Sequence, residues 1–353
     1  MFIKHIGDWK LLRSENYNYN FNIKTGRFER WGKTKEDDPI YSKNGPEILD
    51  IEVTTICKGP KNSEGRHILC PFCYKANNPR GTNMSFDTFK IILDKMPKTL
   101  TQIAFGVDAQ AESNPDLWAM MKYTREQKII PNLTVADIAD SDEVAMNIAR
   151  LAGACAVSRY EDKNICYNSI KKLTDLGMKQ VNIHCMISEE TFDRAIETME
   201  DMKTDSRLKD MYAIVLLSLK KKGRGVGFTP LSQERFNVLC NKAHELKINF
   251  GFDSCGSSKY INFLNQSNFD EDYKKELIKS VEPCEITLFS SYANVYGQYS
   301  PCSFTEHEPL WEDGGIDIVS SEDFLKDVWN NDRTINFRNK LLSCRRNCIL
   351  YKI

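Results

Sequence analysis

The fold is decided by residues 48–74, which read Ile48-Leu-Asp-Ile-Glu-Val-Thr-Thr-Ile56, then a glycine- and lysine-rich loop, then Cys70-Pro-Phe-Cys73-Tyr74. The apolar, β-branched first half predicts a buried strand. Cys57 opens the loop that leaves this strand, so three thiols follow it. Cys70 and Cys73 have the C-x2-C spacing that lets two thiolates ligate one metal centre. Three thiolates leave one position of a four-iron cluster open for a further ligand.

Strand-like and helix-like segments alternate from residue 48 onward. Apolar or β-branched runs are expected strands at 48–56, 102–106, 131–135, 154–158, 180–187 and 212–219. Amphipathic segments are expected helices at about 86–96, 115–128, 141–152, 163–177, 189–203 and 231–246. Six such alternations predict parallel strands with helices outside them. Because a full eight-unit barrel needs about 250 residues and this segment has roughly 200, we expect an α/β fold with a partial (β/α)6 TIM-like barrel.

The chain is expected to have three parts. Residues 1–47 contain two strand-like runs around the turn Lys24-Thr-Gly26 and predict an N-terminal β-hairpin extension. Residues 48–255 form the partial barrel, with a seventh strand-like run at 248–254. Residues 256–353 are expected to form a small C-terminal extension, because the alternation ends beyond about residue 280 and two short strands and a helix follow.

The charge and hydropathy of the chain narrow its function class. Lys and Arg number 48 against 49 Asp and Glu, a formal net charge of −1, so no global field favours nucleic acid or an anionic membrane. No apolar run of about 18 residues occurs, which predicts no transmembrane helix. The first ten residues lack the charged-then-apolar layout of a signal peptide. We therefore expect a cytoplasmic protein without a membrane partner.

Twelve cysteines are many for a cytoplasmic chain, in which clustered thiols bind metal or react more often than they form disulfides. Seven of them form two groups in the sequence, one in the loop after the first predicted barrel strand and one in the C-terminal extension. The first group is Cys57, Cys70 and Cys73, and the second is Cys284, Cys302, Cys344 and Cys348. The five cysteines between these groups have a simpler explanation as small buried apolar residues.

A parallel partial barrel with three cysteines after its first strand resembles the radical SAM superfamily, whose common spacing is C-x3-C-x-Φ-C with Φ aromatic. Cys70-Pro-Phe72-Cys73 matches the second half, and Tyr74 follows as in peptide-modifying members. The first half departs from the pattern, because twelve residues instead of three separate Cys57 from Cys70. The resemblance implies a [4Fe–4S] cluster on these three cysteines that binds S-adenosylmethionine (SAM). The alternative is a zinc site, since tetrahedral sulfur ligation suits both.

The resemblance also assigns residues at the strand ends to cofactor binding. Phe105-Gly106-Val107-Asp108 stands where the family has a Gly-Gly-Glu-like motif for the amino group of SAM, although a plain strand-to-helix turn explains this run equally well. Arg159 would pair with the methionine carboxylate bidentately. His184 shares one strand face with Asn182, and a buried, hydrogen-bonded histidine is its alternative explanation. The candidate cofactor-binding residues are Phe72, Gly106, Asp108, Thr134, Ser158, Arg159, Asn182 and His184.

The C-terminal cysteines resemble the SPASM/twitch extension that many radical SAM enzymes carry. Cys284, Gly297 and Cys302 have its C-x12-G-x4-C spacing. The shorter twitch version completes an auxiliary [4Fe–4S] cluster with a cysteine pair, here Cys344 and Cys348, although C-x2-C is the usual spacing of that pair. A structural zinc ribbon is the alternative. The candidate metal ligands of the whole chain are therefore Cys57, Cys70, Cys73, Cys284, Cys302, Cys344 and Cys348.

Cys255 ends a strand-like run and is the candidate catalytic residue. If its thiol faces the cavity, it would donate a hydrogen atom to a substrate radical, as in radical epimerases, or ligate the auxiliary cluster. A buried structural thiol is the alternative explanation.

The resemblance implies an enzyme that cleaves SAM reductively, with an electron donor such as flavodoxin or ferredoxin. The resulting 5′-deoxyadenosyl radical abstracts hydrogen from the substrate. A ribosomally synthesised peptide is the expected substrate, with a crosslink or an epimerised residue as product. Alternatives are small-molecule dehydrogenation and modification of a nucleotide, nucleoside or nucleic-acid base, where the basic run Lys220-Lys-Lys-Gly-Arg224 would meet phosphates unless it is a solvated loop. A metal-dependent structural or binding protein is the non-enzyme alternative.

Overall fold

A ten-stranded sheet in the spatial order β11-β10-β9-β8-β7-β6-β5-β12-β13-β14 dominates the computed structural model, which describes residues 1–351. From β5 to β11 each strand pairs in parallel with the next. These strands are β5 (Ile48–Glu52), β6 (Gln102–Gly106), β7 (Ile130–Val135), β8 (Cys155–Ser158), β9 (Val181–Ile187), β10 (Ala213–Ser218) and β11 (Phe250–Phe252). The chain is thus a mixed α/β fold on a large parallel sheet, as the alternation predicts.

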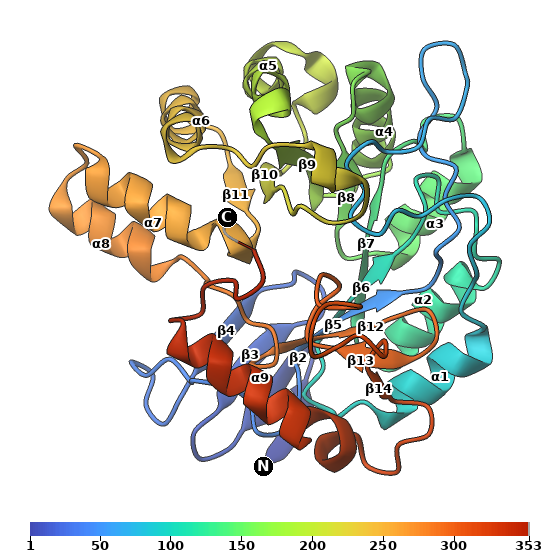
Figure 1. Ribbon diagram of the computed structural model, residues 1–353, viewed down its shortest axis with the longest axis vertical. Helices are drawn as coiled ribbons and strands as arrows, with labels where there is room; N and C mark the ends of the chain where they lie inside the picture. The colour runs from blue at the N-terminus through green and yellow to red at the C-terminus, as the bar shows by residue number, and fades with distance from the viewer. Residues whose placement is uncertain (352–353) are drawn as a thin grey trace.

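Six helices connect these strands and follow one another in an arc around their outer side (Figure 1). They are α1 (Phe86–Lys95), α2 (Leu117–Glu126), α3 (Asp142–Leu151), α4 (Lys163–Asp175), α5 (Phe192–Thr204) and α6 (Gln233–Leu246). The short 3₁₀ turns η1 (Glu189–Thr191), η2 (Ser206–Leu208) and η3 (Gly223–Gly227) lie between them, and η4 (Ser254–Gly256) follows β11. None of the helices in the described part of the chain has the length and apolar composition needed to span a membrane.

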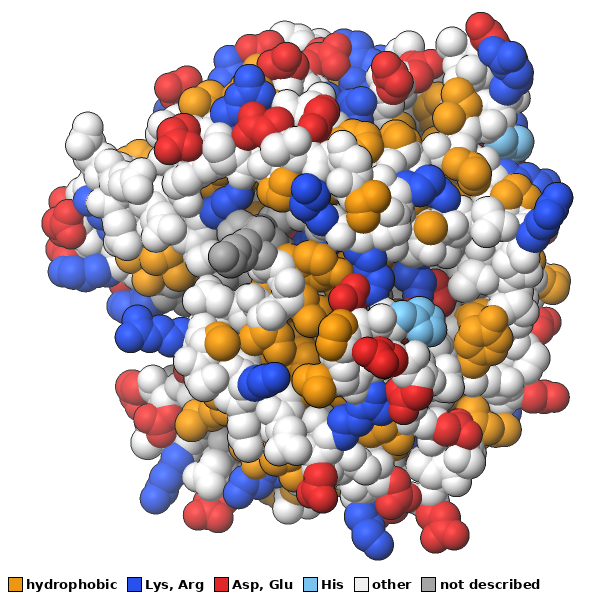
Figure 2. Space-filling view, viewed as in Figure 1, with side chains coloured by type: hydrophobic (Ala, Val, Ile, Leu, Met, Phe, Trp, Pro, Cys, Tyr) orange, Lys and Arg blue, Asp and Glu red, His pale blue; other side chains and the backbone are white. Residues whose placement is uncertain are grey.

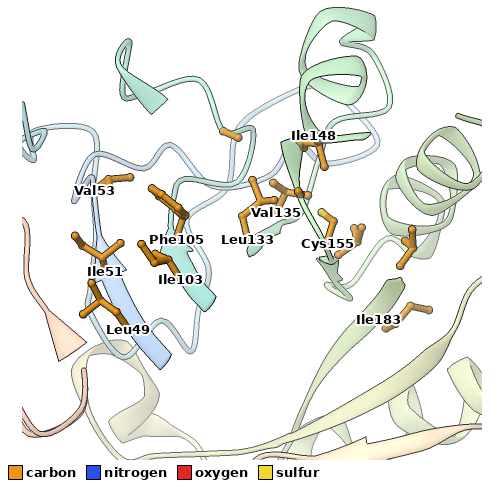
Figure 3. Close-up of a cluster of buried hydrophobic side chains, with 14 of the residues drawn as sticks. Leu49, Ile51, Val53, Ile103, Phe105, Leu133, Val135, Ile148, Cys155 and Ile183 are labelled. Carbon is orange, nitrogen blue, oxygen red and sulfur yellow. The ribbon is translucent and has the colours of Figure 1, made fainter. Parts of the chain in front are cut away.

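The core fills the space between the sheet and these helices (Figure 3). Leu49 and Ile51 of β5, and Val53 directly after it, are buried there beside residues of the next strands, such as Phe105. Because successive strand residues point to opposite faces, Asp50 and Glu52 point to the other face of the sheet. One face of the parallel strands is therefore apolar core, and the other face is free to line a site.

The N-terminal segment is larger than the expected hairpin. It forms a four-stranded antiparallel sheet of β1 (Phe2–Ile6), β2 (Trp9–Arg13), β3 (Asn18–Asn22) and β4 (Phe28–Trp31) in that order. Gly26, at a φ of +75°, lies in the connection between β3 and β4, around which the two strands were expected. The residues of β1 are mostly exposed, so they lack the buried apolar alternation by which a strand is recognised in sequence.

The C-terminal segment adds three strands to the main sheet. β12 (Ser290–Ala293) pairs in parallel with β5, and β13 (Gln298–Ser300) and β14 (Ile316–Asp317) follow in antiparallel pairing. Helices α7 (Ser257–Gln266) and α8 (Glu271–Lys279) precede these strands, and a π-helical segment η5 (Phe324–Trp329) and α9 (Asp332–Ser343) follow them. The parallel β12–β5 pairing places the C-terminal segment next to the strand that leads to Cys57, and Cys302 follows β13, one strand further along the sheet.

Candidate active site

A cavity of about 490 Å³ lies where the parallel strands end. Its walls come from the carboxyl ends of β5 to β10, from the loops after these strands and after β11, and from the C-terminal segment. This is the edge at which open parallel sheets bind ligands. The space-filling view shows a hollow in the middle of the corresponding face, with hydrophobic and charged side chains gathered around it (Figure 2).

Cys57, Cys70 and Cys73 all line this cavity. The backbone N–H of Gly59 donates to the Cys57 sulfur at 3.3 Å, and a backbone N–H of Phe72 donates to Cys70. Burial raises the pKa of Cys70 to about 12. Among the described residues, no three Cys, His, Asp or Glu side chains surround a single metal-ion position. A four-iron cluster takes each thiolate on a different iron, so its thiols stand further apart than those around one ion.

The long loop between Cys57 and Cys70 is held by residues from the loops after β6 and β7. The Asp137 carboxylate accepts the backbone N–H of Lys61 at 3.0 Å. The Gln110 side-chain amide donates to the Gly59 carbonyl at 3.1 Å and to Asp137 at 3.2 Å. A ring nitrogen of His67 also lies 2.8 Å from the Gly59 carbonyl oxygen. The turn at Gly59 is therefore fixed from both sides, which positions Cys57 at the cavity.

Most of the candidate cofactor-binding residues line the same cavity. They are Phe72, Gly106, Asp108, Thr134, Ser158 and His184. The Asp108 carboxylate accepts backbone N–H groups of Glu112 at 3.1 Å and Ser113 at 2.9 Å. It therefore shapes its own loop while it lines the cavity. A Cβ at Gly106 would lie 3.3 Å from the Glu52 Cα, so glycine permits the close β5–β6 approach there.

Arg159 and Asn182 do not line the cavity. Arg159 is 2% exposed, and its guanidinium lies 2.8 Å from the Glu197 carboxylate of α5, on the helix side of the sheet. Asn182 shares the face of His184 but lies two residues nearer the amino end of β9, below the cavity lining. Its side-chain oxygen is buried and has no hydrogen-bond partner among the described residues. Arg159 thus pairs within the protein, and its cofactor role stays a sequence prediction.

His184 is a buried imidazole in the cavity wall. Burial lowers its pKa to about 4, so the ring is neutral at pH 7. The ring lies 3.5 Å from the Thr134 hydroxyl oxygen, between Nδ1 and Oγ1. A neutral histidine offers one hydrogen-bond donor and one acceptor. This fits both explanations of His184, as a cofactor-binding residue and as a buried, hydrogen-bonded histidine.

The C-terminal thiols form a group that includes Cys255. The Cys255 thiol hydrogen-bonds the Cys348 sulfur, and this contact raises the pKa of Cys255 and lowers that of Cys348. Burial raises the pKa of Cys302 to about 12, and nearby Cys284 and Cys348 add to the rise. Cys344, by contrast, is exposed at the end of α9. The structure therefore brings Cys255 to Cys284, Cys302 and Cys348 and leaves Cys344 at the surface.

The basic run after β10 connects the two cysteine groups. The Arg224 guanidinium donates to the carbonyl of Cys70 at 2.7 Å and to that of Asn77 at 3.1 Å. The Lys222 ammonium donates to the carbonyl of Phe304 at 3.0 Å, in the loop after Cys302. Sequence reasoning treated this run as a phosphate contact or a solvated loop. The structure instead uses it to hold the loops that carry the thiols.

Lys220 is buried and forms an ion pair with Asp253, which also accepts the Ser218 hydroxyl at 2.9 Å. The Lys220 ammonium also hydrogen-bonds Cys255. Lys221 is the exposed lysine of the run. The cationic side chains on either side of Lys221 are therefore engaged within the protein.

A buried charge network ties the first cysteine loop to the C-terminal segment. The Lys75 ammonium lies 3.2 Å from the Glu52 carboxylate and 3.0 Å from the Tyr292 hydroxyl, and it also pairs with Glu306. Glu52 and Lys75 also line a second cavity of about 260 Å³. They therefore form part of the wall between the two cavities. Sequence reasoning missed this network, because its members come from four distant segments.

Comparison with solved structures defines the class of fold. The chain shares the fold of radical SAM enzymes with SPASM or twitch domains, so the resemblance predicted from the two cysteine groups is confirmed at the level of the fold. No protein-family model matches the chain, and no curated protein matches it in sequence.

Two proteins represent this class among the matched structures. SuiB from Streptococcus suis has a TM-score of 0.63 and 12% sequence identity over 95% of this chain and 90% of SuiB. SuiB bound to precursor peptide SuiA has a TM-score of 0.62 and 13% identity over 84% of this chain and 67% of SuiB. Native anSMEcpe with bound AdoMet and Cp18Cys peptide has a TM-score of 0.54 and 12% identity over 83% and 82% of the two chains.

Proposed function

We propose that this chain is a radical SAM enzyme that modifies a ribosomally synthesised peptide. The observation that carries the proposal is the convergence of Cys57, Cys70 and Cys73 on one cavity with six of the candidate cofactor-binding residues. The fold adds support, because structures of this fold have been solved with SAM and with peptides bound. On this proposal β5 to β10 and α1 to α6 act as a partial (β/α)6 barrel around the cavity.

The residues at the first cysteine group fit a [4Fe–4S] cluster. The donor set consists of three thiols, and backbone N–H groups donate to two of the sulfurs. Such hydrogen bonds stabilise thiolates and tune an iron–sulfur centre. Arg224 and Asp137 hold the two ends of the loop that carries these thiols. The site therefore has both the ligands and the supporting contacts that the cluster needs.

When bound, the cluster and SAM supply the 5′-deoxyadenosyl radical chemistry of the family. The side chains of this chain bind and orient the cofactor and substrate. Phe72 stacks on Tyr160 with ring centroids 5.6 Å apart and forms an apolar wall beside the thiols. Gly106 leaves room for a ligand at the end of β6, and Asp108 presents a carboxylate there. These walls exclude water, which would otherwise compete with the substrate for contact with a radical.

We further propose that the C-terminal thiols hold an auxiliary [4Fe–4S] cluster on Cys255, Cys284, Cys302 and Cys348. The contacts among these four support the assignment, and Cys344 has no such support. On this assignment Cys255 is a cluster ligand, not a hydrogen-atom donor. Four thiolates close the shell, which favours electron transfer or structural support.

A peptide is favoured over a nucleic acid as the substrate. The basic run that would have met phosphates is engaged with protein carbonyls and carboxylates, and Lys221 alone among its lysines is exposed in the described structure. We place the reaction in the cytoplasm, where thiols stay reduced and where a flavodoxin or ferredoxin would deliver the electron.

The proposal is tested by electron paramagnetic resonance of the anaerobically reconstituted, reduced protein with and without SAM. We expect SAM to change the spectrum, because Cys57, Cys70 and Cys73 would leave one iron of the cluster free for a further ligand. Cys57→Ala should abolish this change, and Cys284→Ala should keep it. A wild-type spectrum that is identical with and without SAM would contradict the proposal.

A further inference from the structure

The carboxylates that line the cavity differ in how many hydrogen-bond and ion-pair partners they have. Four of them line it among the described residues: Asp50, Glu52, Asp108 and Asp253. Lys75 pairs with Glu52, and Lys220 pairs with Asp253. Backbone N–H groups of its own loop donate to Asp108. These contacts leave Asp50 as the carboxylate to be explained.

Asp50 lies at the centre of β5, on the face that forms the cavity. Its neighbours in register are Ala104 of β6 on one side and Tyr292 of β12 on the other. Its side chain is accessible to the cavity, although it lies deep in the protein, where burial raises its pKa to about 6. Within the described part of the chain, its carboxylate has no hydrogen-bond or ion-pair partner, and burial alone accounts for the pKa shift.

A carboxylate that faces a cavity without a protein partner is free to form an ion pair with a cationic group of a ligand. The cavity has no cation to spare for Asp50 among the described residues. Lys75 and Lys220 have carboxylate partners, and Arg224 donates to the carbonyls of two residues of the first cysteine loop. The neutral ring of His184 adds no charge. At neutral pH the cavity therefore presents a negative charge at Asp50 that no cation of the described residues pairs with.

The depth of Asp50 limits what can reach it. It lies two residues before Glu52 on the strand, which is roughly 7 Å further from the carboxyl end of β5 at the usual rise per residue. Ala104, its neighbour in register on β6, is the apolar lining residue beside it. A group that reaches Asp50 from the carboxyl ends of the strands must carry its charge at the end of a long stem. Lysine and arginine side chains have this form.

We propose that Asp50 anchors the ammonium or guanidinium group of a lysine or arginine side chain of the peptide substrate. This inference rests on the proposed function, because it assumes that a peptide enters the cavity. It adds a specificity that the proposed reaction does not require: a cationic residue at or beside the site of modification. The anchor fixes the peptide by an ion pair inside the cavity, while the thiols lie in the loop that follows the same strand.

The test compares binding of matched short peptides to the reconstituted protein in the presence of SAM and without reductant. The probes are Ac-Gly-Gly-X-Gly-Gly-amide peptides, with X either lysine or its neutral analogue norleucine, and either arginine or its neutral analogue citrulline. Isothermal titration calorimetry gives each affinity. We expect the wild type to prefer one cationic peptide over its neutral analogue by about tenfold or more, the effect of a charged hydrogen bond. Asp50→Asn should reduce this preference to less than about twofold.

The control is Asp210→Asn, a surface carboxylate that lies 3.8 Å from the Lys209 ammonium. This variant should keep the preference. A wild type that binds cationic and neutral peptides equally, or binds neither, overturns the inference, and so does an Asp50→Asn variant that keeps the preference. If Asp50→Asn weakens SAM binding instead, Asp50 contacts the sulfonium and the inference is also overturned. Failure to cleave SAM would remove the proposed function but would leave the measured peptide preference intact.

Discussion

The Cys255 thiol lies against the Cys348 sulfur, and Lys220 hydrogen-bonds it from the cavity side. Cys344 lies only four residues before Cys348 in sequence but is exposed where α9 ends. The backbone there turns through Arg345 and Arg346, both at positive φ, so the chain reverses between the two cysteines. This reversal separates two thiols whose spacing resembles a ligand pair.

The two candidate ligands predict different iron contents. We expect Cys255→Ala to lower the iron of the reconstituted protein from about eight toward about four atoms per chain, because each [4Fe–4S] cluster holds four irons. Cys344→Ala should keep about eight irons per chain, because an exposed thiol outside the group contributes no ligand. The opposite pattern would restore Cys344 as the ligand. Colorimetric iron and sulfide assays measure both variants.

Sequence reasoning reached the residues of the first cysteine group because strand, loop and C-x2-C spacing are local features. Of the eight candidate cofactor-binding residues that it named, the structure brings six to one cavity. Arg159 was named because it follows a strand, but position at a strand end does not tell which side its long side chain takes. Sequence reasoning did not select Asp50, because a single carboxylate in an apolar run matches no motif for a functional site. Only the structure shows that its side chain faces the cavity without a hydrogen-bond or ion-pair partner.

The loop that contains η3 acts as a clamp between two distant parts of the chain. The backbone N–H of Arg224 donates to the Cys73 carbonyl, and its side chain reaches the carbonyls of Cys70 and Asn77. Gly223, at a φ of +55°, approaches so closely that a Cβ would lie 2.3 Å from the Tyr74 carbonyl oxygen. The clamp therefore needs glycine at one position and a planar, many-donor side chain at the next.

Removing the clamp should weaken the first cluster site and leave the fold in place. Arg224→Ala removes charged hydrogen bonds to two carbonyls of the cysteine loop, each worth about 1.5–3 kcal/mol. We expect lower iron occupancy of this site and a weaker response of the electron paramagnetic resonance spectrum to SAM. Lys221→Ala, in the same run but exposed, is the matched control and should behave as wild type. Equal behaviour of the two variants would exclude the clamp.

The N-terminal sheet is joined to the body by a buried ion pair. The Arg30 guanidinium lies 3.1 Å from the Glu47 carboxylate and 2.8 Å from that of Glu285, and the Tyr17 hydroxyl donates to Glu47 at 2.6 Å. The Glu47 side chain is 2% exposed. Burial raises the pKa of Glu47 to about 7, although Arg30 opposes the rise. The stability of this junction therefore depends on Arg30.

Arg30→Ala should lower the free energy of unfolding by about 3–5 kcal/mol, the usual cost of leaving a buried charge without its partner. The loss should be larger at pH 8 than at pH 6. Without Arg30 the pKa of Glu47 rises further, so the folded variant holds this proton at pH 6 and suffers the full cost only where the carboxyl is ionised. Arg27→Ala, in an exposed pair with Glu29, is the control and should change stability little. Urea denaturation at both pH values measures the difference.

At the scale of the whole molecule, three distant segments meet at one cavity. They are the loop after β5, the loop after β10 and the C-terminal segment that contains β12, the strand paired with β5. The six predicted strand–helix units all occur, because strong alternation over 200 residues leaves few other arrangements. The parallel β12–β5 pairing was not predictable in this way. β12 has four residues and follows two helices, so its partner is set by tertiary packing and not by a local pattern.

The central claim is that this cavity supports reductive cleavage of SAM. The most direct measurement is the formation of 5′-deoxyadenosine and methionine by the anaerobically reconstituted protein with SAM and dithionite, quantified by liquid chromatography and mass spectrometry. We predict both products in equal amounts from the wild type, and none above the protein-free background from a variant with Cys57, Cys70 and Cys73 all replaced by alanine. A reconstituted, iron-loaded wild type that forms no more 5′-deoxyadenosine than this variant would contradict the claim.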